Sequence, residues 1–203
     1  MGRGAMIPDW GTLFGMALQT VPEPRKVARD LFNMGFSRRA LWLALAFLLV
    51  AMTWLGVIAS ILFPPDPAQV GTLLADPIRS GLVEAAIAVL SVFGIWRIGR
   101  AFGGQGRLED VLMTMVWLQF VLAVMEIGVL ALMLFAPGLA VLLWIMGIVM
   151  SFWIMAHFTT EAHGFRSAGL VFAVMISVIL GVAMVLSFIL VLLGVAPPVA
   201  GAG

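Results

Sequence analysis

RIGRAFGGQGRLED, the stretch at residues 97–110, separates two long apolar runs and decides how the chain is organised. The run before it covers residues 78–98 and the run after it covers residues 111–136. Each run is long enough to cross a bilayer, because about 20 apolar helical residues span a hydrocarbon core of about 30 Å. The stretch therefore predicts a hairpin of two transmembrane helices joined by an arginine-rich turn.

The composition of the whole chain supports a membrane environment. Of 203 residues, 63% are hydrophobic and only 10% are charged, whereas charged residues reach about a quarter of an average soluble domain. The net charge of +1 gives no indication of a nucleic-acid partner. The absence of cysteine excludes disulfides, thiolate metal sites and cysteine nucleophiles.

Five apolar runs predict an all-α integral membrane protein with one membrane domain at residues 40–195. The predicted spans are residues 40–63, 78–98, 111–136, 139–158 and 168–195. The prolines of PPDP at residues 64–67 end the first span. Residues 196–203, APPVAGAG, are expected to form a short disordered tail outside the membrane.

Residues 1–39 form the largest polar segment and are expected to carry amphipathic helices. Apolar residues recur there at helical spacing, first from Trp10 to Val21 and then, after VPEP, at Val27, Leu31 and Met34. Such stripes are typical of helices that lie on the membrane surface. A helix docked on the protein is an equal alternative. Because the first apolar run begins near residue 40, we expect an uncleaved anchor rather than a signal peptide.

The basic residues predict the orientation of the five spans. Ten of the 11 Lys and Arg residues fall on one side, namely Arg3, Arg25, Lys26, Arg29, Arg38, Arg39, Arg97, Arg100, Arg107 and Arg166. Arg79 alone falls on the other. Cytoplasmic loops carry the excess of Lys and Arg, so we expect a cytoplasmic N-terminus and a C-terminus outside.

Three polar residues within the spans are candidates for a functional site: Glu84, Gln119 and Glu126. Glu126 lies about 22 Å into its span at 1.5 Å per residue, and Gln119 shares its helical face. An ionisable side chain at that depth is a candidate proton or cation site. The alternative, which we favour, is a neutral carboxyl that pins two helices together. For the shallower Glu84, a structural role in helix packing is favoured, and a site paired with Glu126 is the alternative.

Small residues at four-residue spacing indicate close helix packing in the last two spans. Residues of this kind let helix backbones approach closely. They are Gly147 and Ser151 in the fourth span, and Gly169, Ala173, Ser177 and Gly181 in the fifth. Another span of the chain is the favoured partner, and a second copy, which would make a homo-oligomer, is the alternative.

No pattern predicts catalysis, a cofactor or a metal. His157 and Glu161 share a helical face, but their spacing to His163 matches no zinc motif. The GGQG at residues 103–106 lacks the P-loop pattern and is interpreted as a tight reversal. Six basic residues are candidate contacts to anionic lipid or to a partner protein: Arg25, Lys26, Arg29, Arg97, Arg100 and Arg107.

The chain resembles the Yip family (Ypt/Rab-interacting membrane proteins) in its bacterial branch. The resemblance rests on TVPEPRKVARDLF at residues 20–32, on FGGQGRLEDVLMTMVWLQF at residues 102–120, and on the order of five spans. It implies the family's five-span fold and, for the bacterial branch, an inner-membrane location. The Asp-Leu-Tyr-Gly-Pro motif of eukaryotic members is missing, and Asp30, Leu31 and Phe32 are only a partial match. The resemblance therefore implies the fold rather than Rab binding.

Together these patterns predict a non-enzymatic membrane scaffold or accessory protein. Its expected partners are membrane lipids and other membrane proteins, with no nucleic acid. The alternative is a small transporter or channel subunit that uses Glu84 and Glu126. Transporters often contain internal repeats or spans broken near the midplane, and neither feature is found in this sequence.

Overall fold

The computed structural model describes residues 9–64 and 76–192, and all of its elements are helices. In chain order they are α1 (Trp10–Gln19), α2 (Pro24–Asn33), α3 (Arg38–Leu62), α4 (Pro77–Ala101), α5 (Leu108–Met133), α6 (Pro137–His163) and α7 (Ala168–Leu192). The last five are long and apolar enough to cross a membrane. This result confirms the predicted all-α membrane fold. The expected tail at residues 196–203 and most of the loop after the first span lie outside the described residues.

Polar side chains and prolines define the helix ends close to the predicted positions. The side chain of Ser37 accepts a hydrogen bond from the Ala40 N–H at the start of α3, and Asp76 accepts one from the Ile78 N–H at the start of α4. Such caps satisfy backbone donors that have no partner within the helix. At the other end of α6, Gly164 adopts the left-handed conformation with φ of 71° and ends the helix.

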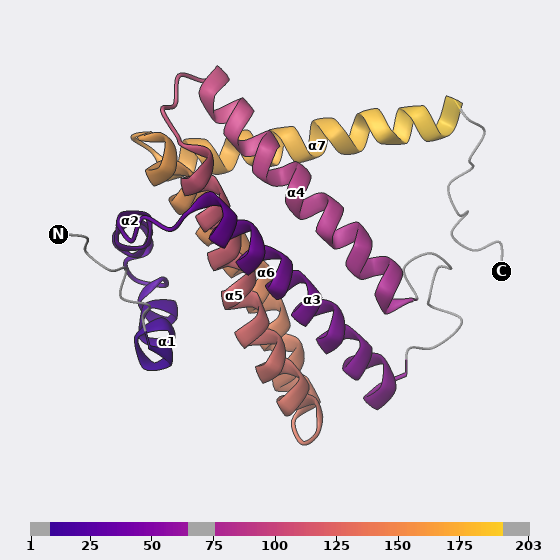
Figure 1. The fold of residues 1–203 in the computed structure, drawn as a ribbon. Helices are drawn as coiled ribbons and strands as arrows, with labels where there is room; N and C mark the ends of the chain where they lie inside the picture. Colours follow the sequence, from indigo (N-terminus) through magenta and orange to yellow (C-terminus); the bar gives the residue numbers. More distant parts are fainter. Residues whose placement is uncertain (1–8, 65–75, 193–203) are drawn as a thin grey trace.

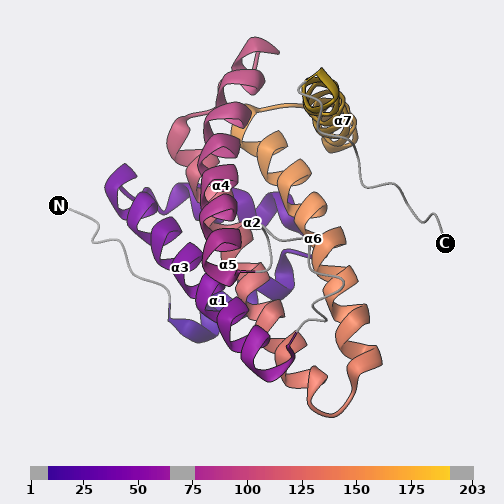
Figure 2. The ribbon, with the colours of Figure 1, turned by 90° about the vertical axis from the view of Figure 1, so that its right-hand side faces the viewer.

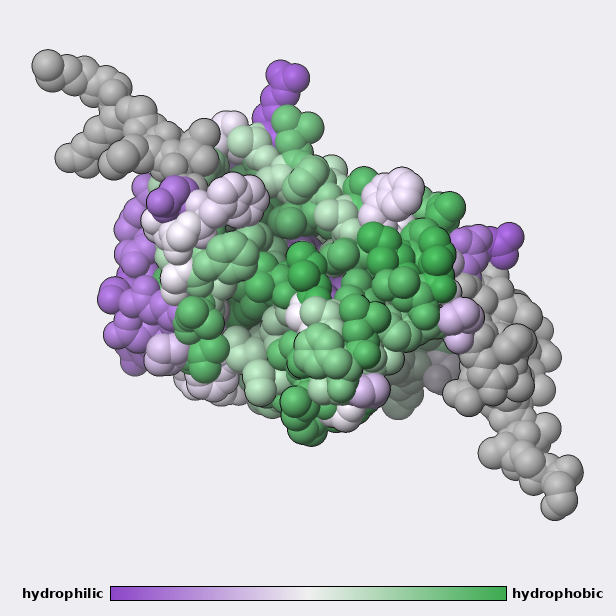
Figure 3. Space-filling view, turned by 90° about the horizontal axis from the view of Figure 1, so that it is seen from below, coloured by the Kyte–Doolittle hydropathy of each residue, from purple (hydrophilic) through white to green (hydrophobic). Residues whose placement is uncertain are grey.

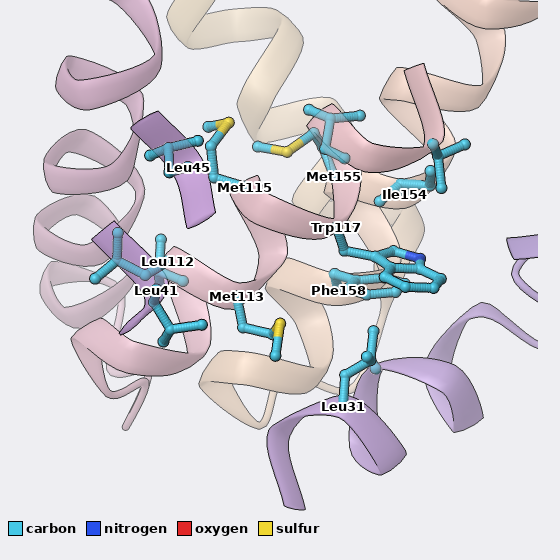
Figure 4. Close-up of a cluster of buried hydrophobic side chains, with 14 of the residues drawn as sticks. Leu31, Leu41, Leu45, Leu112, Met113, Met115, Trp117, Ile154, Met155 and Phe158 are labelled. Atoms are coloured by element: carbon cyan, nitrogen blue, oxygen red, sulfur yellow. The ribbon is translucent and has the colours of Figure 1, made fainter. Parts of the chain in front are cut away.

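α5 occupies the centre of a bundle formed by α3, α4, α5 and α6 (Figures 1 and 2). It packs most extensively against α6 and α3. Figure 4 shows the side chains that fill this interior. Large, fully buried members are Leu45, Leu112, Ile154 and Phe158, which come from α3, α5 and α6. We use the term Arg-rich end for the end of the bundle that holds the α4–α5 connection and the C-terminus of α6.

α2 is docked on the bundle and does not present its apolar stripe to a membrane. Val27 and Leu31 are buried, and Leu31 lies beside Trp117 and Phe158 (Figure 4). Phe32 meets Phe158 edge to face, with ring centroids 6.2 Å apart. The alternative of a docked helix, left open by the sequence, therefore describes α2.

α7 leaves the bundle. It packs against α6, where Phe152 and Phe172 meet edge to face at 6.0 Å between ring centroids. From there it extends away from the other helices (Figure 1), and in Figure 2 it is seen nearly end-on at the edge of the molecule. No residue of its most apolar 18-residue stretch is buried.

The outer surface of the bundle is strongly apolar. Exposed large side chains include Phe47 and Trp54 on α3, Leu90 on α4 and Trp144 on α6. Seen from below, hydrophobic residues cover most of the face, and hydrophilic residues gather at its edges (Figure 3). A surface of this kind is suited to a hydrocarbon solvent, since a soluble monomer rarely exposes large contiguous apolar patches.

Candidate functional site

Two of the three polar residues within the spans form a direct contact. Gln119 on α5 is only 5% exposed, and its Nε2 donates a hydrogen bond of 3.2 Å to Oε1 of Glu84 on α4. The side-chain carbonyl of Gln119 is buried without a hydrogen-bond partner in the described protein. The structure thus brings Gln119 to Glu84 on a neighbouring helix, a pairing that the sequence did not predict.

Glu126 lines a separate cavity of about 210 Å³ between α3, α5 and α6. Trp144, Gly147 and Ser151 of α6 form part of its wall, and Met52 contributes from α3. The Ser151 hydroxyl donates to the Ile148 carbonyl at 2.7 Å, which leaves its lone pairs as acceptors. Among the described residues, no Lys or Arg forms an ion pair with Glu126. The cavity therefore combines one carboxyl group with a largely apolar wall inside the predicted membrane region.

At the Arg-rich end, Glu161 of α6 binds two of the predicted contact residues. The Arg25 Nε donates to Glu161 Oε2 at 2.9 Å, and an Arg29 guanidinium nitrogen lies 3.3 Å from Oε1. The Glu161 side chain is 15% exposed, whereas the two arginine side chains are 41% and 53% exposed. Because exposed ion pairs contribute only about 0–1 kcal/mol each, we attribute the docking of α2 mainly to its apolar contacts.

The remaining basic candidates have different surroundings. Lys26 lies 3.1 Å from Glu23, and Arg107 lies 3.9 Å from Glu109. The side-chain amide of Gln19 and then Lys26 bind the Glu23 carboxylate, and both lower the pKa of that carboxyl.

Arg97 and Arg100 lie on an open surface at the end of α4, beside Trp96. There the Arg100 guanidinium lies 5.3 Å from the ring centroid of Trp96. Neither arginine forms an ion pair within residues 9–64 and 76–192. Of the six basic candidates, these two are therefore the ones without an ion-pair partner among the described residues.

The glycine-rich connection surrounds His163, a contact that the sequence did not predict. The His163 side chain is 3% exposed, and its Nε2 has no hydrogen-bond partner in the described part of the chain. A Cβ added at Gly104 or Gly106 would lie 2.7 Å from ring atoms of His163, and one at Gly99 would overlap the ring directly. The Gln105 N–H also donates to the His163 carbonyl at 3.1 Å. The segment is thus a reversal, as predicted, and also a close-fitting pocket for this ring.

The three side chains considered as metal ligands, His157, Glu161 and His163, contact different partners. His157 Nδ1 lies 2.9 Å from the Trp153 carbonyl, Glu161 binds the arginines of α2, and His163 is enclosed by the glycines. The described residues contain no group of three or more side chains that could hold a metal ion.

The small residues of α6 and α7 differ in their surroundings. Gly147 is buried, and a Cβ there would lie 3.8 Å from Met125 and 3.9 Å from Leu122 of α5. On α7, by contrast, Gly169, Ala173 and Ser177 are exposed, and a Cβ on Gly181 would meet nothing within 4 Å. The small residues of α7 therefore do not pack against another helix of the described chain. Their spacing in the sequence had favoured such packing.

Comparison with known proteins identifies the family. The family model described as the Yip1 domain matches residues 18–193, which includes α2 and all five long helices. Neither the comparison with curated proteins nor the comparison with solved structures gives a match. Because the family model covers most of the chain, the predicted resemblance to the Yip family is confirmed, while its bacterial branch stays a prediction: the chain is a multi-pass membrane protein that belongs to the Yip1-domain family.

Proposed function

We propose that this protein is a non-enzymatic membrane scaffold that binds other membrane proteins through α7. In this proposal it resides in a bacterial inner membrane with its N-terminus and Arg-rich end in the cytoplasm and its C-terminus outside. The distribution of Lys and Arg supports that orientation. Membership of the Yip1-domain family is consistent with the proposal.

The exposure of α7 is the observation that carries the proposal. The helix diverges from the bundle, and the side chains of Leu180, Met184 and Phe188 are each more than 60% exposed. Its exposed small residues Gly169, Ala173 and Ser177 would let a second helix backbone approach closely. A transmembrane helix of another membrane protein has the chemistry to fit this surface. It matches α7 in length and hydrophobicity, and it needs no polar complement.

Substituting the small residues of α7 tests the proposal. We expect Ala173→Leu with Gly181→Leu to remove a stoichiometric membrane-protein partner from a mild, lipid-retaining extract, because leucine side chains would hold the two backbones apart. The measurement is quantitative mass spectrometry of the copurifying proteins.

The matched control is Val178→Leu with Val182→Leu, which adds bulk to another side of the same helix and should keep the partner. Loss of the partner from both double variants would show that α7 tolerates no change, and an unchanged partner set in the first would rule out the small-residue surface. A wild-type chain that purifies without any protein partner would contradict the scaffold function itself.

The alternative function, a small transporter or channel subunit, is supported by one observation. Glu126 faces a cavity between three helices, and a carboxyl in such a position can take up a proton or a cation. The cavity wall is otherwise largely apolar, which suits a neutral carboxyl at least as well as a charged one.

Replacing Glu126 with glutamine separates the two functions. Under the scaffold proposal we expect Glu126→Gln to insert, fold and keep its partner, because the amide has the size of a neutral carboxyl. The control is Glu109→Gln, which removes a carboxyl that pairs with Arg38 before the predicted span begins and does not line the cavity. A cation or proton flux in vesicles that is present in wild type and in the control but lost in Glu126→Gln would support transport instead.

A further inference from the structure

The short helix α1 has three chemically distinct sides. One side is buried against the rest of the protein, and it carries Met16 and Thr20 at its C-terminal end. A second side is exposed and apolar: Trp10, Phe14 and Leu18 are 71%, 46% and 76% exposed. A third side is exposed but small or polar, with Thr12 and Gly15. No residue from Trp10 to Gln19 carries a charge, and the carboxylate of Asp9 just before the helix accepts a hydrogen bond from the Thr12 N–H.

Two contacts fix α1 at a defined height on α5. The Trp117 Nε1 donates a buried hydrogen bond of 3.0 Å to the Thr20 hydroxyl. Farther along α5, Phe120 meets Phe14 with ring centroids 6.2 Å apart. Counted from Leu108 at the Arg-rich end, Trp117 and Phe120 lie about 14 and 18 Å along the helix at 1.5 Å per residue.

That height falls inside one leaflet of a bilayer. α5 has 26 residues and is about 39 Å long, so about 4.5 Å projects at each end of a hydrocarbon core of about 30 Å. With α5 centred on the bilayer, Trp117 and Phe120 lie about 9 and 14 Å below the hydrocarbon boundary, short of the midplane. α1 has 10 residues and is only about 15 Å long, too short to cross. In Figure 1 it lies beside α5 on the far side of α2 from the Arg-rich end.

We propose that α1 is embedded in the leaflet at the Arg-rich end, with Trp10, Phe14 and Leu18 in contact with lipid acyl chains. The depth of its contacts and its lack of charge favour lipid as the occupant. The division of its exposed surface into an apolar and a polar side is typical of helices that lie in one leaflet. α1 then adds volume to that leaflet only and acts as a wedge beside the bundle. The location of α1 in this leaflet does not depend on the proposed orientation. The orientation decides only whether the leaflet is the cytoplasmic one.

Site-directed spin labelling of the full chain in lipid vesicles tests the inference. Because the chain has no cysteine, Leu18→Cys and Thr12→Cys each introduce a single labelling site on an exposed side of α1. The purified variants are reconstituted in vesicles of phosphatidylethanolamine and phosphatidylglycerol. Collision with oxygen, which concentrates in the acyl region, is compared with collision with a water-soluble nickel complex.

We expect the oxygen-to-nickel collision ratio to be several-fold higher for the label at residue 18 than for the label at residue 12. Equal ratios dominated by nickel would place α1 in water and overturn the inference. A second copy of the chain would instead shield the label at residue 18 from both reagents and bring two labels close enough to broaden the spectrum. That result would also overturn the inference. The experiment uses purified protein and does not involve α7, so its result is independent of whether a partner protein is found.

Discussion

Replacing Gly99 with alanine is expected to destabilise the folded protein by about 3 kcal/mol, at the upper end of the usual cost of overpacking. The added methyl group would overlap the ring of His163. The ring cannot move aside, because Gly104 and Gly106 also lie against it and His163 is only 3% exposed. The measurement is the thermal unfolding midpoint in detergent, which is monitored as the loss of monodisperse protein on heating.

The same helix provides the control. A Cβ added at Gly94 would meet nothing within 4 Å, so Gly94→Ala should leave the midpoint unchanged or raise it slightly, since alanine favours a helix over glycine by about 0.5–1 kcal/mol. Combining Gly99→Ala with His163→Ala removes the ring that the methyl group would strike. The double variant should therefore be less destabilised than the sum of the two single variants. Equal midpoints for Gly99→Ala and Gly94→Ala would contradict the enclosed position of His163.

The five long helices were predictable because their signal is local. Length and continuous hydrophobicity identify a span without knowledge of its neighbours, and each predicted span overlaps the helix observed. The boundaries differ by a few residues, because hydrophobicity marks the part of a helix that lies in the membrane, whereas turn and capping residues determine where the helix itself ends. α6 continues to His163, past the predicted end at residue 158, because a helix can project beyond the hydrocarbon until a residue such as Gly164 ends it.

The contacts between distant segments were not predictable, because periodicity describes one helix at a time. The stripe at Val27 and Leu31 predicts that one side of α2 is covered but does not say whether lipid or protein covers it. The answer depends partly on Glu161, which lies more than 130 residues further along the chain. In the same way, the glycines at residues 103–106 indicated a turn. Their second role required the position of His163, whose only sequence signal was a histidine at a helix end.

Replacing Val27 with aspartate is expected to release α2 from the bundle while the five long helices remain inserted. Val27 is fully buried, and burying an unpaired carboxylate carries an effective penalty of several kcal/mol. The ion pairs of Arg25 and Arg29 with Glu161 are too exposed to offset that penalty, since such pairs contribute at most about 1 kcal/mol each. Insertion of the long helices depends on their own hydrophobicity and should not change.

Limited digestion with trypsin reports the release, because three of its cleavage sites, Arg25, Lys26 and Arg29, lie on α2. Cleavage of a docked segment follows the population that is transiently open, and each 1.4 kcal/mol changes that population about ten-fold. We therefore expect cleavage within α2 to accelerate at least ten-fold in Val27→Asp. The control Asn33→Asp introduces the same side chain at an exposed position of α2 and should be digested at the wild-type rate. If both variants are digested at that rate, α2 is held by something other than the buried stripe, and the two ion pairs with Glu161 become the contacts to remove next.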